Sequence, residues 1–126
     1  MYNNERFKYE PIFTIYMAEE SIFLEYVGDS PRMRVLQYLI EGRDFDYTLT
    51  DMLNAGVSWG TLNTLVPKLL GLGIVTKTRK IGRATLYKLN QGNVAVKQLV
   101  ELYDNLVLQK LSSLEAQTKK AEIVAR

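Results

Sequence analysis

Residues 48–71 read TLTDMLNAGVSWGTLNTLVPKLLG, and their pattern predicts two short helices joined by a tight turn. Thr48 is a helix-capping residue with an acid three positions later, at Asp51, which is the signature of a capping box at a helix start. Ser58 is a second candidate cap, and Gly56 between the two helices tolerates the positive φ of a sharp turn. The sequence therefore predicts a helix-turn-helix motif.

The residues on either side extend this motif. Residues 28–31, Gly-Asp-Ser-Pro, combine a cap with a proline for the first helical position, so they predict a helix from about 31 to 41. After the second helix of the motif, over about 59–70, residues 74–89 read as two strands around a turn at 81–83. A hairpin in this place forms the wing of a winged helix-turn-helix.

The two ends of the chain differ in how clearly their sequences predict secondary structure. Residues 1–18 are aromatic and interrupted by Pro11, and they fit an extended arm, a short strand or part of the first helix. From about 18 to 27, the spacing of apolar residues predicts a helix. From about 93 to 118, apolar residues recur every three or four positions, which predicts a long helix. Its stripe is longer than a small domain can cover, so we predict that it packs against a second copy, the alternative being a helix folded back on its own core. The predicted dimer interface consists of Leu99, Tyr103, Leu106, Val107, Leu111 and Leu114.

The predicted fold class is mainly α with a small β-hairpin: a winged helix-turn-helix with a long C-terminal dimerisation helix. We divide the chain into an N-terminal arm and helix at 1–28, a winged helix-turn-helix domain at 29–90 and the dimerisation helix at 91–126.

The composition excludes several classes of chemistry. The 126 residues contain neither cysteine nor histidine, which excludes disulfides, zinc fingers, Ser-His-Asp triads and cysteine nucleophiles. We find no phosphate-binding glycine loop and no acidic cluster with metal-binding spacing, so we predict no catalytic residue, no metal and no cofactor. No apolar run reaches the roughly 18 residues that span a bilayer. The N-terminus does not resemble a signal peptide, so we expect a cytoplasmic protein without a membrane partner.

The charge is unevenly distributed. Residues 52–100 contain seven basic and no acidic residues, whereas the remaining chain has nine basic and fourteen acidic ones. A segment of charge +7 beside a remainder of −5 is typical of a surface that binds a polyanion, although a solvated charged surface is the simpler alternative.

Four segments resemble one family. Residues 28–36, 57–62, 69–75 and 81–89 are similar to the first core helix, recognition helix, helix exit and wing of the MarR/ArsR winged-helix transcription regulators, especially small archaeal members. The similarity extends over residues 23–103, about two-thirds of the chain. It implies a regulator that binds double-stranded DNA and dimerises through terminal helices. Metal-sensing members use cysteine or histidine ligands, which this chain lacks.

The helix at about 59–70 is then the candidate recognition helix for the major groove, with the wing at 74–89 on the backbone or minor groove. Asn63 could read adenine and Lys68 could hold a phosphate, while Trp59 is either a boundary anchor or a DNA contact. Pro67 is expected to bend this helix or end it early. The predicted DNA-binding residues are Ser58, Gly60, Thr61, Asn63, Thr64, Lys68, Lys77, Arg79, Lys80 and Arg83. At the start of the helix at 31–41, Ser30 and Arg32 could add a phosphate contact, although capping alone explains Ser30.

Two other functions stay open. A winged helix also serves as a docking module in larger assemblies, and then the basic segment would face an acidic protein surface. The aromatic N-terminus could line a pocket for a small-molecule effector or simply belong to the core or an interface. The sequence does not identify an operator, a target gene or an effector.

Overall fold

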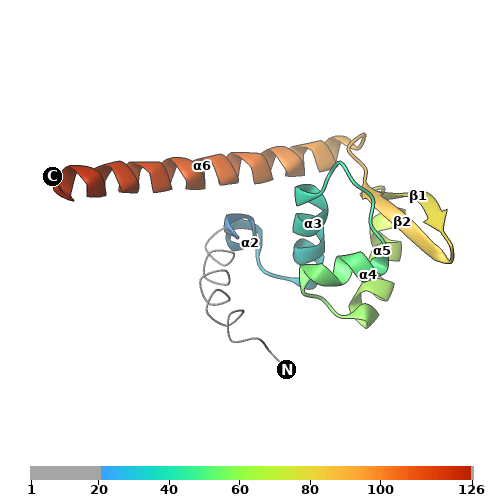
Figure 1. Cartoon of the computed structure of the whole chain (residues 1–126). Coiled ribbons are helices and arrows are strands. Elements are labelled where there is room, and N and C mark those ends of the chain that lie inside the picture. Colours follow the sequence, from blue (N-terminus) through green and yellow to red (C-terminus); the bar gives the residue numbers. More distant parts are fainter. Residues whose placement is uncertain (1–20, 126) are drawn as a thin grey trace, which may run out of the picture.

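The computed structural model describes the backbone of residues 21–125 and the side chains of residues 21–121. The N-terminal arm discussed above lies outside the described residues. In chain order, the elements are α2 (Ile22–Val27), α3 (Pro31–Glu41), α4 (Leu49–Met52), the 3₁₀ helix η1 (Leu53–Ala55), α5 (Trp59–Gly71), β1 (Val75–Ile81), β2 (Ala84–Leu89) and α6 (Val94–Ala125). The predicted fold class, mainly α with a small β-hairpin and a long C-terminal helix, is confirmed. Figure 1 shows the hairpin projecting from one end of a helical body, while α6 extends beyond the other end.

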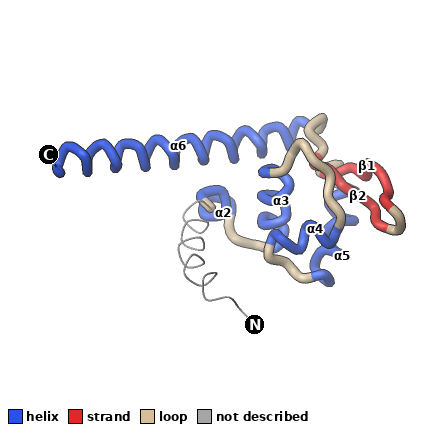
Figure 2. Tube along the Cα trace, viewed as in Figure 1, coloured by secondary structure: helices blue, strands red, loops and turns tan. Residues whose placement is uncertain are grey.

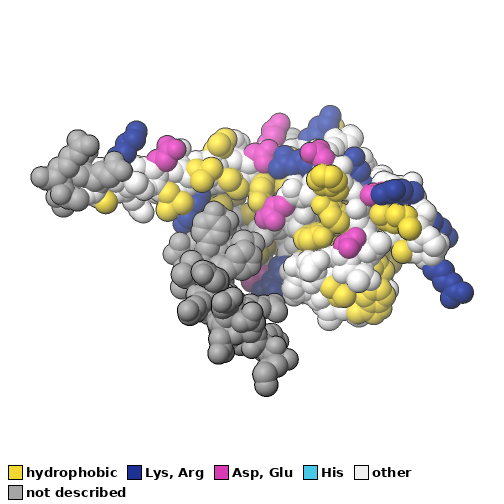
Figure 3. Space-filling view, in the orientation of Figure 1, with side chains coloured by type: hydrophobic (Ala, Val, Ile, Leu, Met, Phe, Trp, Pro, Cys, Tyr) yellow, Lys and Arg dark blue, Asp and Glu magenta, His cyan; other side chains and the backbone are white. Residues whose placement is uncertain are grey.

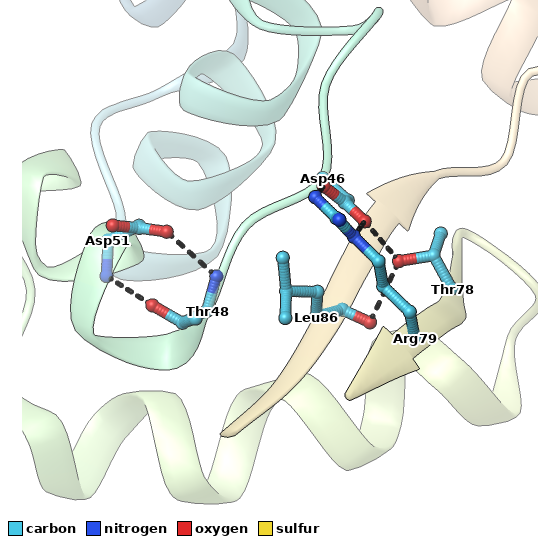
Figure 4. Close-up of polar contacts among 6 residues, drawn as sticks. All are labelled: Asp46, Thr48, Asp51, Thr78, Arg79 and Leu86. Carbon is cyan, nitrogen blue, oxygen red and sulfur yellow. Dashed lines mark hydrogen bonds and ion pairs between the residues drawn. The ribbon is translucent and has the colours of Figure 1, made fainter. Parts of the chain in front are cut away.

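The starts of α3 and α4 follow the capping signals. The hydroxyl of Ser30 accepts a hydrogen bond from the Met33 amide at 3.2 Å, with Pro31 in the first helical position. At α4 the capping box is complete, because Thr48 and Asp51 each accept a hydrogen bond from the other's backbone amide, at 3.1 and 2.9 Å (Figure 4). Local hydrogen bonds of the chain therefore explain where both helices begin.

The turn between α4 and α5 is glycine-dependent. Gly56 has φ of 81° and ends the short 3₁₀ helix, and Ser58 then caps α5 by accepting from the Thr61 amide at 3.1 Å. The guanidinium of Arg34 on α3 donates to the Gly56 carbonyl at 3.2 Å, which fixes the turn against the neighbouring helix. These contacts confirm the predicted helix-turn-helix.

Two helices end later than predicted. Pro67 lies inside α5, which continues to Gly71, so the expectation of an early end is wrong. A proline inside a helix removes one hydrogen bond, but Leu62, Leu65 and Leu69 are buried on the inner face and hold the helix in place. α6 reaches Ala125 rather than 118, because the intervening residues are good helix formers without glycine or proline.

The core lies between α2, α3, α5, the base of the hairpin and the first half of α6. Its largest fully buried side chains include Phe23, Leu39, Ile40, Leu62 and Leu69. These residues come from the inner faces of three helices, in agreement with their spacing in the sequence. Within the described residues, no helix combines the length and apolar composition that a bilayer crossing requires.

The hairpin is a twisted antiparallel pair with a two-residue turn (Figure 2). Ile81 pairs with Ala84, and the turn uses a positive φ of 60° at Gly82, the first of its two central residues. The register shifts between Lys77 and Arg79, which indicates a bulge in β1.

Candidate nucleic-acid interface

The outer face of α5 carries small and polar side chains. Gly60, Asn63, Thr64 and Lys68 are exposed, whereas Leu62, Leu65, Val66 and Leu69 face the core. Within α5 there is no acidic residue. The helix therefore presents a shallow, uncharged to positive surface, as the sequence predicted for these positions.

Local hydrogen bonds order the polar groups of this face. The Asn63 amide donates to the Trp59 carbonyl at 3.1 Å, and the Thr64 hydroxyl donates to the Gly60 carbonyl at 3.2 Å. At the start of the helix, the Ser58 hydroxyl donates to the Thr61 hydroxyl at 2.8 Å. Each side chain keeps further donor or acceptor capacity, so these contacts orient the groups without exhausting them.

The start of α3 lies beside this face. A hollow of about 420 Å³ is lined by residues of both helices, among them Arg32, Thr61, Thr64 and Lys68. Arg32 is exposed on the first turn of α3, where the Ser30-Pro31 start places it. The structure thus brings two cations from different helices to one concave surface. Trp59, half exposed, does not belong to the buried core.

The hairpin carries the exposed cations Lys77, Lys80 and Arg83. Figure 3 shows Lys and Arg side chains gathered around the projecting hairpin. Gly82 and Arg83 form the turn itself, so Arg83 is at the tip. The sequence predicted that Lys77, Lys80 and Arg83 lie on a cationic wing, and the structure places all three on the hairpin.

Among the described residues, Arg79 is the wing cation that forms an ion pair. Its guanidinium donates to both carboxylate oxygens of Asp46, at 2.9 and 3.1 Å, and the Thr78 hydroxyl donates to the same carboxylate at 2.5 Å (Figure 4). These hydrogen bonds, from Arg79 first and then from Thr78, lower the pKa of Asp46 to about 2. Asp46 was not among the predicted site residues. Nothing in the local sequence pairs it with a residue 33 positions away.

The predicted dimer residues divide into two groups along α6. Leu106 is buried in the chain's own core, and Leu99 and Tyr103 pack against that core. Tyr103 contacts the Phe23 ring edge-on and donates a hydrogen bond to Glu41 at 2.9 Å. Burial and the nearby Glu41 carboxylate raise the pKa of the Tyr103 hydroxyl. These three residues therefore have little surface left for a second copy.

The second group lies farther along the helix. Leu111 is 50% exposed and Leu114 is 40% exposed, and both line a hollow of about 230 Å³ with Val107 beside α2 and α3. Leu108, which was outside the predicted interface, is 60% exposed. Apolar side chains are visible along this part of α6 in Figure 3.

Comparison with known proteins shows the fold. No family model matches the chain, and no curated protein is similar to it in sequence. Among solved structures, NadR in complex with 4-hydroxyphenylacetate has a TM-score of 0.58 at 14% identity, over 99% of this chain and 87% of that one. MepR, a transcription regulator of the Staphylococcus aureus multidrug efflux pump MepA, has a TM-score of 0.56 at 12% identity, over 98% and 93% of the two chains. A mutant of S. aureus MepR bound to an oligodeoxyribonucleotide has a TM-score of 0.55 at 13% identity, over 99% and 96%. In fold, the chain is a winged helix-turn-helix protein that resembles the MarR-type transcription regulators.

Proposed function

We propose that this chain is a transcription regulator that binds double-stranded DNA in a sequence-specific way, with α5 in the major groove. The observation that carries the proposal is the outer face of α5, which is small, polar and free of acid, next to the exposed cations of the hairpin. The likeness to MepR supports it, because one of the similar MepR structures is bound to an oligodeoxyribonucleotide.

The dimensions of α5 suit this role. Its 13 residues span about 20 Å, and the major groove is wide enough to admit an α-helix. Gly60 has no neighbouring atom where a side chain would project, so the helix backbone can approach base edges there. Asn63 is the candidate base reader, and Lys68 and Arg32, which line the same hollow, would hold phosphates.

The wing supplies charge rather than base recognition in this proposal. Lys80 and Arg83 lie at or next to the tip of a hairpin that projects from the body, where they can reach the backbone or the minor groove. Each phosphate that a cation neutralises releases counterions, so the affinity must fall steeply with salt.

We further propose that the protein acts as a cytoplasmic homodimer through the second half of α6. The exposed leucines 108, 111 and 114 lie in this half of the helix, and Leu111 and Leu114 line the hollow of about 230 Å³ beside α2 and α3. A two-fold pair would present two recognition helices to two half-sites.

The test is fluorescence anisotropy of a labelled duplex titrated with the protein at several salt concentrations. Arg83→Ala should weaken binding to all duplexes alike and reduce the slope of log affinity against log salt by about one unit. Lys119→Ala removes an exposed charge from the far end of α6 and is the matched control, with no change in slope expected.

The failure of the wild-type protein to bind duplex even at low salt would reject the proposal. A search for an acidic protein partner would then follow, since a winged helix can also serve as a docking module.

A further inference from the structure

The Arg79–Asp46 pair belongs to a small framework at the base of the hairpin. The register of β1 shifts between Lys77 and Arg79, so Thr78 has no pairing partner in β2. Its hydroxyl turns to the Asp46 carboxylate instead, and it also lies 3.4 Å from the Leu86 carbonyl oxygen. At the bulge, Thr78 thus contacts another part of the chain, the segment between α3 and α4 (Figure 4).

The position of Asp46 is fixed by its neighbour. Tyr47 forms an antiparallel bridge with Tyr87 of β2, in which the two backbones exchange hydrogen bonds of 2.8 Å in both directions. This bridge places the segment alongside the hairpin. The Asp46 side chain is only 17% exposed, whereas that of Arg79 is 60% exposed. The carboxylate is therefore a preformed acceptor, and the arginine folds back onto it.

We infer that Asp46 is a positioning residue for the wing, and that it keeps Arg79 in this framework and out of the set of DNA contacts. The inference rests on the proposed function. It assigns the phosphate contacts of the wing to its other cations, Lys80 and Arg83 among them, and it revises the prediction that Arg79 binds DNA.

The chemistry of a carboxylate and a phosphate supports this assignment. Both accept the two parallel N–H groups of a guanidinium, so they compete for the same donor. Transfer of Arg79 to a phosphate would leave Asp46 negatively charged and unpaired close to the DNA backbone. The exchange would therefore gain one attraction and create one repulsion, whereas Lys80 and Arg83 can bind a phosphate without releasing an acid.

Salt dependence separates the two roles of an arginine. Arg79→Ala alone would leave Asp46 unpaired near the DNA, so we compare variants that leave no unpaired acid. Arg83→Ala should lower the salt slope by about one unit. Asp46→Asn should free Arg79 to reach a phosphate and make the slope steeper by up to about one unit, and the double variant Asp46→Asn/Arg79→Ala should return to the wild-type slope. Asp44→Asn is the matched control, because it removes an exposed acid two residues away without releasing an arginine from a described ion pair.

A second measurement does not depend on DNA binding. In the ¹⁵N-labelled protein, the Arg79 Nε–H signal should be protected from exchange, persist when duplex is added and disappear in Asp46→Asn. A salt slope for Asp46→Asn/Arg79→Ala that falls below that of the wild type, or loss of this signal on addition of duplex, would overturn the inference. If no duplex binds, the proposed function fails, and the signal in the free protein still tests the framework: its absence from the wild type would reject the pair. Circular dichroism of each variant confirms that it folds.

Discussion

Asn63 lies on the exposed face of α5 with its side-chain amide already anchored to the helix. One of its two N–H groups donates to the Trp59 carbonyl, which leaves the other N–H and the amide oxygen available. One donor and one acceptor are what a bidentate contact with adenine requires. The hydrogen bond within the helix thus leaves available the groups that would contact a base under the proposed function.

Asn63→Ala should therefore relax the preference at a single base pair by about 1–3 kcal/mol. The measurement is competition between a selected operator and its single-base variants. Gln98→Ala, an exposed amide on α6, serves as the control. An equal loss of affinity for every duplex would remove Asn63 as a base reader and make it a general contact.

At the scale of the element, two glycines near helix ends have opposite surroundings. A side chain at Gly60 in α5 would meet nothing, whereas one at Gly42, at the end of α3, would collide with the Tyr47 ring. That ring packs edge-on against Tyr38, with the ring centroids 4.9 Å apart, so it has little freedom to move away.

We therefore expect Gly42→Ala to destabilise the fold by about 1–3 kcal/mol through overpacking. Gly60→Ala should stabilise it by about 0.5–1 kcal/mol, because alanine restricts the unfolded chain and favours a helix. Urea denaturation measures both. If α5 enters the major groove closely, Gly60→Ala should also bind duplex more weakly despite its greater stability. A variant that is more stable and binds as well as the wild type would place Gly60 outside the contact.

Elements whose signals are local could be predicted from the sequence, and those that depend on distant residues could not. Ser30, Thr48 and Ser58 cap the helices they were predicted to cap, because each hydrogen bond spans three residues. The role of Asp46 depends on a contact with a residue 33 positions away and on a bulge in β1. No glycine or other turn residue in the strand predicts that bulge. Similarly, periodicity revealed the stripe on α6 but not which of its residues the chain's own core would cover.

At the scale of the whole molecule, the two candidate interfaces lie at opposite ends (Figure 1). The hairpin and α5 occupy one end of the molecule, and the second half of α6 extends from the other. The Arg43–Asp104 ion pair, at 2.7 Å, joins the body to α6 between them. Changes in the α6 stripe should thus alter assembly without altering the surface proposed to contact DNA.

The double variant Leu108→Lys/Leu111→Lys should convert a dimer into a folded monomer, since two charges would replace half-exposed leucines in the proposed interface. Sedimentation equilibrium determines the mass. Leu72→Lys, at an exposed leucine after α5, is the matched control and should leave the dimer intact. A monomeric wild-type protein at all accessible concentrations would reject the homodimer.

From Leu108 to Ala121, α6 is exposed at every residue except Lys110. A helical segment of this length is marginal in water when nothing packs against it. If a second copy supplies that packing, folding of this segment and association become a single equilibrium governed by mass action. Under the proposed function, the fraction of molecules able to hold two half-sites would then rise more steeply than the amount of protein, so the abundance of the protein would itself set a threshold for DNA binding.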